Sequence, residues 1–100
     1  MNVSTDPYFS QDPLLERLNE FCRSQDMQYS DRRWRVALKL REMNRDAEAE
    51  EVWISMKSDG YAISISCVYQ SLGILTDARI CICTKVTNRQ WVYRIHPDFI

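Results

Sequence analysis

Apolar residues recur at helical spacing on both sides of one short polar break near the middle of the chain. Before the break, one face of a helix is formed by Ala49, Val52, Trp53 and Met56. Ser58-Asp59-Gly60 interrupts the pattern, and Gly60 suits a left-handed helix cap. After the break, the apolar stripe consists of Ile65, Val68, Leu72 and Leu75, and the opposite side carries Ser64, Ser66, Tyr69 and Gln70. The pattern predicts a helix-turn-helix whose second helix, Ser64 to Leu75, presents an uncharged polar face.

Two further helices are predicted before this pair. Asp12-Pro13 is a helix-start signal, and the apolar face that follows ends near Ser24 and consists of Leu14, Leu15, Leu18, Phe21 and Cys22. Ser30 is expected to cap the next helix. In this helix we expect Trp34, Ala37, Leu38 and Leu40 to be buried. We expect Arg32, Arg35, Lys39 and Arg41 to face solvent. Asp46 is expected to cap the helix that contains Ala49.

Beyond Arg79 the apolar period changes from 3.6 to 2. Ile80, Ile82 and Thr84 alternate with Cys81, Cys83 and Lys85, and a second run places Trp91, Tyr93 and Ile95 on one side. The polar segment 86–89 separates the two runs, which predicts an antiparallel hairpin. The order of elements predicts a mainly α domain with a small β-hairpin, a winged helix-turn-helix. We divide the chain into an N-terminal leader and helix (1–28) and the winged-helix domain (29–100).

Charge is unevenly distributed along the 100 residues, whose net charge is −1. Residues 1–28 carry two arginines against five acids, whereas residues 29–100 carry eleven basic and nine acidic groups. The net negative charge of the whole chain argues against a polyanionic partner. This argument is weakened because the predicted winged helix, residues 29–100, is itself net positive. No apolar run approaches the roughly 20 residues of a membrane span, and no signal peptide is visible. We expect a cytoplasmic protein with no membrane partner.

Cys81 and Cys83 are the best candidates for metal or redox chemistry. They alternate on one strand face, about 7 Å apart by strand rise, but a zinc site needs two more ligands and His96 is the only histidine. Packing as small apolar side chains is the favoured alternative. The chain has no glycine-rich phosphate loop and no Ser-His-Asp candidate. We expect no enzyme activity, no catalytic residues, no metal site and no cofactor.

From about Tyr29 to Ile95 the sequence resembles the DNA-binding half of the ferric-uptake-regulator family. Five stretches in order carry the resemblance: Ser30-x-x-Arg33, Ala49-Glu50-Glu51-Val52-Trp53, Ile65 to Leu72 with Val68-Tyr69-Gln70 at its centre, Asp77-Ala78-Arg79-Ile80, and Val92-Tyr93-Arg94-Ile95. Gln70 stands where that family has arginine, and Arg79 stands where it has glycine. The sequence ends soon after the second wing strand, so we expect the family's metal-binding dimerisation domain to be absent.

The resemblance and the polar helix face together predict a transcription regulator that binds double-stranded DNA. The expected DNA contacts are Arg33, Ser64, Ser66, Tyr69, Gln70, Lys85 and Arg89, with Arg32, Arg35 and Arg94 as further basic candidates. A homodimer is expected to pair through Leu14, Leu15, Leu18 and Phe21 of the N-terminal helix. The alternative is a winged-helix protein-interaction module that has lost DNA binding, which Gln70, the neutral second helix and the acidic leader favour.

Overall fold

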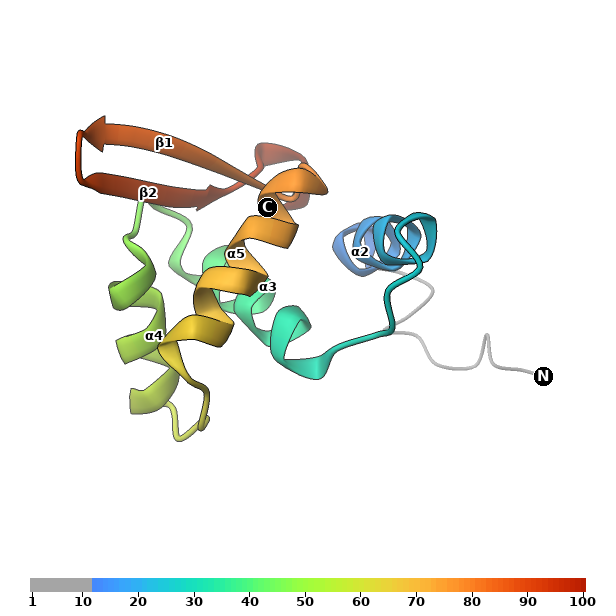
Figure 1. Ribbon diagram of the computed structural model, residues 1–100, viewed down its shortest axis with the longest axis horizontal. Coiled ribbons are helices and arrows are strands. Elements are labelled where there is room, and N and C mark those ends of the chain that lie inside the picture. Colours follow the sequence, from blue (N-terminus) through green and yellow to red (C-terminus); the bar gives the residue numbers. More distant parts are fainter. Residues whose placement is uncertain (1–11) are drawn as a thin grey trace.

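The computed structural model describes residues 12–100, so residues 1–11 of the predicted leader lie outside it. In chain order the elements are α2 (Pro13–Ser24), α3 (Asp31–Met43), α4 (Ala49–Ser58), α5 (Ile65–Asp77), β1 (Cys81–Thr87), β2 (Gln90–Ile95) and the 3₁₀ helix η2 (Pro97–Phe99). In Figure 1 the hairpin extends above α4 and α5, α3 lies behind α5, and α2 lies on the side away from α4. This mainly α arrangement with one antiparallel hairpin confirms the predicted winged helix-turn-helix.

Helix α2 begins as its sequence predicts. The Asp12 carboxylate accepts a hydrogen bond from the Leu14 backbone N–H (3.1 Å), and Pro13 is the first helical residue. Its apolar face is already covered, because Leu14, Leu15 and Leu18 are buried within the single chain and only Phe21 is partly accessible. Pairing of two copies through this face would therefore require α2 to leave the core, and the homodimer stays a prediction.

The start of α4 differs from the prediction. Asp46 is not the cap: its carboxylate lies 3.7 Å from Arg94 Nη1. Glu48 precedes the helix instead, and its backbone N–H donates to the Glu51 carboxylate (2.9 Å). The reason is long-range, because Ala47 and Tyr93 exchange two backbone hydrogen bonds (3.0 and 2.8 Å) that keep Ala47 extended against β2. At the other end of α4, Gly60 has a φ of +84°, as its position in the turn predicts.

Helix α3 packs against α4, α5 and β2 at the centre of the domain. Val36, Ala37 and Leu40 are fully buried, whereas Trp34 is only partly buried. The expected solvent-facing position of Lys39 is wrong, because the residue is only 6% exposed. Its ammonium group donates to Glu42 (3.2 Å) and to Asp59, which lies just beyond α4. A buried lysine thus ties α3 to the turn of the helix pair.

The hairpin register places Cys81 opposite Ile95, Cys83 opposite Tyr93 and Lys85 opposite Trp91, with an irregularity between Lys85 and Thr87. Strand β1 continues to Thr87, so the turn is shorter than predicted. The expected alternation is confirmed, since these six residues share one side of the ladder. Within residues 12–100, we find no helix long and apolar enough to cross a membrane.

Candidate nucleic-acid interface

The outward face of α5 carries the side chains that the sequence assigned to base contacts. Val68, Leu72 and Leu75 are fully buried on the inner side. Tyr69 is 46% exposed on the outer side, and the remaining exposed polar residues are Ser64, Ser66 and Gln70. The 3.6-residue period separates the two sets, so the polar face is open to a partner.

The two serines at the start of α5 interact with each other and with the helix. The Ser64 hydroxyl oxygen accepts a hydrogen bond from the Cys67 backbone N–H (3.1 Å), which makes Ser64 the N-cap. The Ser64 and Ser66 hydroxyls lie 3.2 Å apart. Ser64 therefore has a structural role, and Ser66 and Gln70 are the less constrained polar side chains of this face.

Tyr69 has a partner that the sequence analysis missed. Its hydroxyl donates to the Glu50 carboxylate (3.0 Å), and this hydrogen bond to a carboxylate raises the pKa of Tyr69 above its ordinary value. The pair lies at a hollow of about 230 Å³ between α4, α5 and the wing, lined by Glu48, Ala49, Glu50, Tyr69, Arg89, Trp91 and Tyr93. The sequence offers only one signal for the contact: both residues fall in stretches that carry the family resemblance. Spacing alone does not reveal it, because the two residues are 19 positions apart.

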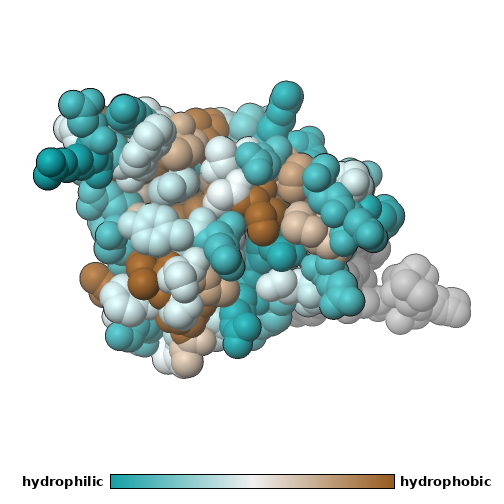
Figure 2. Space-filling view, in the orientation of Figure 1, coloured by the Kyte–Doolittle hydropathy of each residue, from teal (hydrophilic) through white to brown (hydrophobic). Residues whose placement is uncertain are grey.

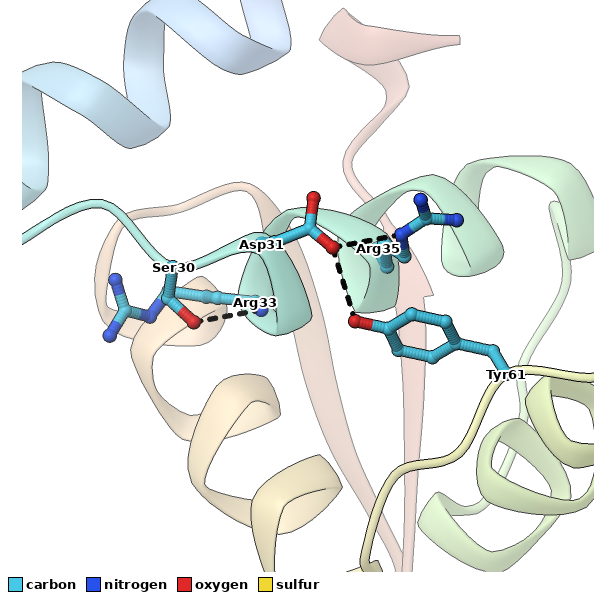
Figure 3. Close-up of polar contacts among 5 residues, drawn as sticks. All are labelled: Ser30, Asp31, Arg33, Arg35 and Tyr61. Atoms are coloured by element: carbon cyan, nitrogen blue, oxygen red, sulfur yellow. Dashed lines mark hydrogen bonds and ion pairs between the residues drawn. The ribbon is translucent and has the colours of Figure 1, made fainter.

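Several of the predicted phosphate-binding arginines are held by internal partners. Arg33 Nη1 donates to Cys22 Sγ (3.2 Å) and to the Gln28 carbonyl (3.2 Å), which fixes the link between α2 and α3. Figure 3 shows the Arg33 backbone N–H on the Ser30 hydroxyl and the Arg35 guanidinium on the Asp31 carboxylate. Asp31 also accepts from the Tyr61 hydroxyl (3.2 Å), and Arg35 lies 4.7 Å from the centroid of that ring. With Arg94 paired to Asp46, these side chains are less available to a ligand than the sequence implies.

The wing carries basic side chains without acidic partners. Lys85 Nζ lies 5.5 Å from the centroid of the Trp91 ring, and Arg89 is exposed in the turn. Neither side chain forms an ion pair with any residue between 12 and 100. Figure 2 shows hydrophilic side chains gathered at the end of the wing, at the upper left of the view. The wing therefore presents positive charge beside the outer face of α5, where Arg89 and Tyr69 line the same hollow.

The cysteines are arranged for packing. All four thiols are free, and Cys22 and Cys81 are buried. Burial raises the pKa of the Cys81 thiol to about 11, so the group is uncharged at neutral pH. His96 accepts the Asp98 backbone N–H at Nδ1 (3.1 Å). In the part of the chain that the structure describes, no three His, Cys, Asp or Glu side chains converge into a metal-binding group.

Comparison with known proteins adds to this geometry. The sequence profile of the Ferric uptake regulator family matches residues 24–98. No curated protein matches the sequence.

Solved structures share the fold. The Helicobacter pylori ferric uptake regulator is 24% identical, with a TM-score of 0.73 over 82% of this chain and 55% of its own. The Vibrio cholerae ferric uptake regulator is 18% identical, with a TM-score of 0.68 over 82% of this chain and 63% of its own. A manganese uptake regulator is 27% identical, with a TM-score of 0.63 over 81% of this chain and 60% of its own. The chain thus spans between 55 and 63% of the lengths of these three structures.

Proposed function

Since the chain belongs to the ferric uptake regulator family, whose profile covers residues 24–98, we propose that it is the DNA-binding part of a transcription regulator. It acts in the cytoplasm by binding double-stranded DNA, without catalysis and without a cofactor of its own. One observation carries the proposal: an exposed, uncharged polar face on the second helix of the helix-turn-helix, beside a basic wing.

In this proposal, α5 enters the major groove and its outer face reads bases. The Gln70 amide has the donor and acceptor that match the N6 and N7 edge of adenine, and the Ser66 hydroxyl can donate or accept. Tyr69 offers its ring to a thymine methyl. Its hydroxyl donates its one proton to the Glu50 carboxylate, so it would reach a phosphate only after leaving that partner.

Affinity comes from outside α5, because that helix contains no lysine or arginine. Counterion release on phosphate neutralisation supplies most non-specific binding to DNA. Lys85 and Arg89 on the wing are the proposed phosphate contacts. Arg33 contributes its remaining guanidinium donors while it braces α2 against α3.

The second candidate function is a winged-helix module that binds protein instead of DNA. The acidic side chains Glu48 and Glu50 beside Tyr69 favour it, because carboxylates at a DNA-facing hollow repel phosphates. The two functions predict different salt dependence, so one titration separates them.

The test is a fluorescence-anisotropy titration of the full chain with mixed genomic DNA fragments across a range of salt concentrations. DNA binding predicts a linear fall of log affinity with log salt, with a slope of about −0.9 per phosphate contact. Lys85→Gln and Arg89→Gln should each make the slope shallower by about 0.9 without changing sequence preference.

Gln70→Ala should instead change the preferred sequence in a selection from random DNA. Gln28→Ala, which removes an exposed glutamine side chain from the link between α2 and α3, is the matched control and should leave preference unchanged. Absence of any binding at low salt would overturn the DNA proposal in favour of the protein-interaction module.

A further inference from the structure

A second, larger hollow lies where the start of α3, the end of α4 and the start of α5 meet. Its volume is about 580 Å³, and its chemically distinctive lining residues are Arg32, Trp53, Lys57, Ser64 and Cys67. We call it the Arg32–Lys57 hollow. It contains two basic side chains and no carboxylate among its lining residues, in contrast to the hollow beside the wing, which contains Glu48 and Glu50.

Both basic side chains of the hollow lack an acidic partner. Arg32 forms no ion pair or side-chain hydrogen bond with another described residue, whereas Arg33 and Arg35 on the same helix have internal acceptors. Lys57 Nζ lies 4.4 Å from the centroid of the Trp53 ring and likewise forms no ion pair within residues 12–100. An unneutralised pair of cations around a concave surface attracts anions.

Two contacts fix the positions of Trp53 and Lys57 at the side of the hollow. Trp53 Nε1 donates to the Ile63 carbonyl (2.8 Å), which fixes the indole between α4 and the segment that leads into α5. The cation–π contact then keeps the Lys57 ammonium group against this ring at the edge of the hollow. The charge is therefore positioned by the fold and not only by its place in the sequence.

The hollow adjoins the outer face of α5. Ser64 and Cys67, in the first turn of that helix, form part of its lining, and Tyr69 and Gln70 follow within the next turn. The partial positive charge at the start of α5 adds to that of the two side chains. An anion in the hollow would therefore lie next to the base-reading positions.

We propose that the Arg32–Lys57 hollow binds a phosphate group of the DNA backbone that flanks the bases read by α5. This inference rests on the proposed function. The ligand is a phosphate because two cations without acidic partners line one hollow and attract an anion. Its source is the DNA backbone because the hollow borders the exposed reading face. The hollow supplies the charge that Gln70 does not, and neither Arg32 nor Lys57 belongs to the residues that match the family motifs.

The test compares Arg32→Gln, Lys57→Gln and the double variant with the wild-type chain, again by anisotropy with DNA across salt concentrations. The double variant should make the log–log slope shallower by about 0.9, the value for one phosphate contact, which corresponds to about an eightfold loss of affinity at 0.1 M salt, and each single variant should show part of this change. Sequence preference should not change. Arg79→Gly is the matched control: it removes one positive charge beyond the far end of the 13-residue α5, about 20 Å from its start.

Three outcomes would overturn the proposal. If wild type binds DNA and the variants retain its slope and affinity, the hollow is not a phosphate contact, although the proposed function stands. If Arg79→Gly weakens binding equally, only net charge matters. If wild type does not bind DNA at low salt, the inference fails together with the proposed function.

A parallel NMR titration with inorganic phosphate follows the Trp53 indole signal. A shift in that titration with unchanged DNA slopes would assign the hollow to free phosphate groups instead of DNA.

Discussion

Replacing Arg79 by glycine should stabilise the domain. Arg79 follows the end of α5 and has a φ of +62°, in the left-handed region. Its N–H donates to the Thr76 carbonyl (3.0 Å), and the Ile80 N–H donates to the Leu75 carbonyl (2.9 Å). This pair of hydrogen bonds is a Schellman cap, which usually has glycine at the position of Arg79. The Arg79 side chain is exposed and forms no hydrogen bond or ion pair with residues 12–100.

The expected gain follows from two opposing terms. A non-glycine residue in the left-handed conformation costs roughly 1–2 kcal/mol. Glycine offsets about 0.5–1 kcal/mol of that gain because it adds conformational freedom to the unfolded chain. The net increase in the free energy of unfolding is therefore about 0.5–1 kcal/mol, or roughly 2–8 °C in Tm for a domain of this size.

The assay is urea unfolding followed by circular dichroism, with Asn44→Gly as the control. Asn44 also has a positive φ, of +47°, but asparagine tolerates this conformation, so its replacement should gain no more than a few tenths of a kcal/mol. Arg79→Val should lower the free energy of unfolding by about 1 kcal/mol or more, because a β-branched residue is strained there. A loss of stability in Arg79→Gly, or wild-type stability in Arg79→Val, would refute the assignment of strain to this position.

Three further predictions concern caps, thiols and glycines. The Asp12 carboxylate accepts two hydrogen bonds from Arg41 (3.0 and 2.9 Å), and these contacts lower the pKa of Asp12 below its ordinary value of 3.8. Asp12→Asn keeps a capping side chain, so it should cost about 1 kcal/mol at pH 7 in urea unfolding. The difference in the free energy of unfolding between wild type and Asp12→Asn should vanish as the pH falls below 3.8 and then through the lower pKa of the folded state, because a protonated carboxyl loses the ion pair with Arg41. A difference that persists at pH 2 would contradict the ion pair. Cys22 and Cys81 are buried, and burial raises the pKa of the Cys81 thiol to about 11. Iodoacetamide at pH 8 should therefore label Cys67 and Cys83 before Cys22 and Cys81, as measured by peptide mass spectrometry. Early labelling of Cys81 would show that its site opens readily. Gly73→Ala, in the exposed interior of α5, should raise the free energy of unfolding by about 0.5–1 kcal/mol. Gly60→Ala should lower the free energy of unfolding by about 1 kcal/mol because Gly60 has a positive φ. A Cβ has open space at both Gly60 and Gly73, so equal effects of the two substitutions would contradict the conformational explanation.

Local signals in the sequence predicted most helix boundaries. Asp12-Pro13 and Ser30 start α2 and α3 as expected, because a cap involves only neighbouring residues. The prediction for Asp46 was wrong because the segment before α4 is held by Tyr93, 46 positions away from Ala47, and such a contact leaves no local pattern.

The candidate interface was predicted only in part for the same reason. The period of α5 was enough to place Tyr69 and Gln70 on an exposed face. It did not show that Glu50 accepts the Tyr69 hydroxyl, or that Arg33 contacts Cys22. The Arg35–Asp31 pair is different, because its spacing of four residues on one helix is a local signal. Lys57 lies four positions after Trp53 on α4, but only the fold brings these two side chains to the same hollow as Arg32.

The sequence by itself determined the order of the elements, the inner and outer faces of α5 and the alternation along the hairpin, because apolar periodicity and capping act within a few residues. Only the tertiary structure decided which basic groups are neutralised and which remain free. The Arg41–Asp12 and Lys39–Asp59 ion pairs and the hollows form between side chains that are distant in sequence, and their geometry depends on how the helices pack. The sequence therefore predicted which helix carries an exposed polar face, whereas the tertiary structure decided where the positive charge lies around it.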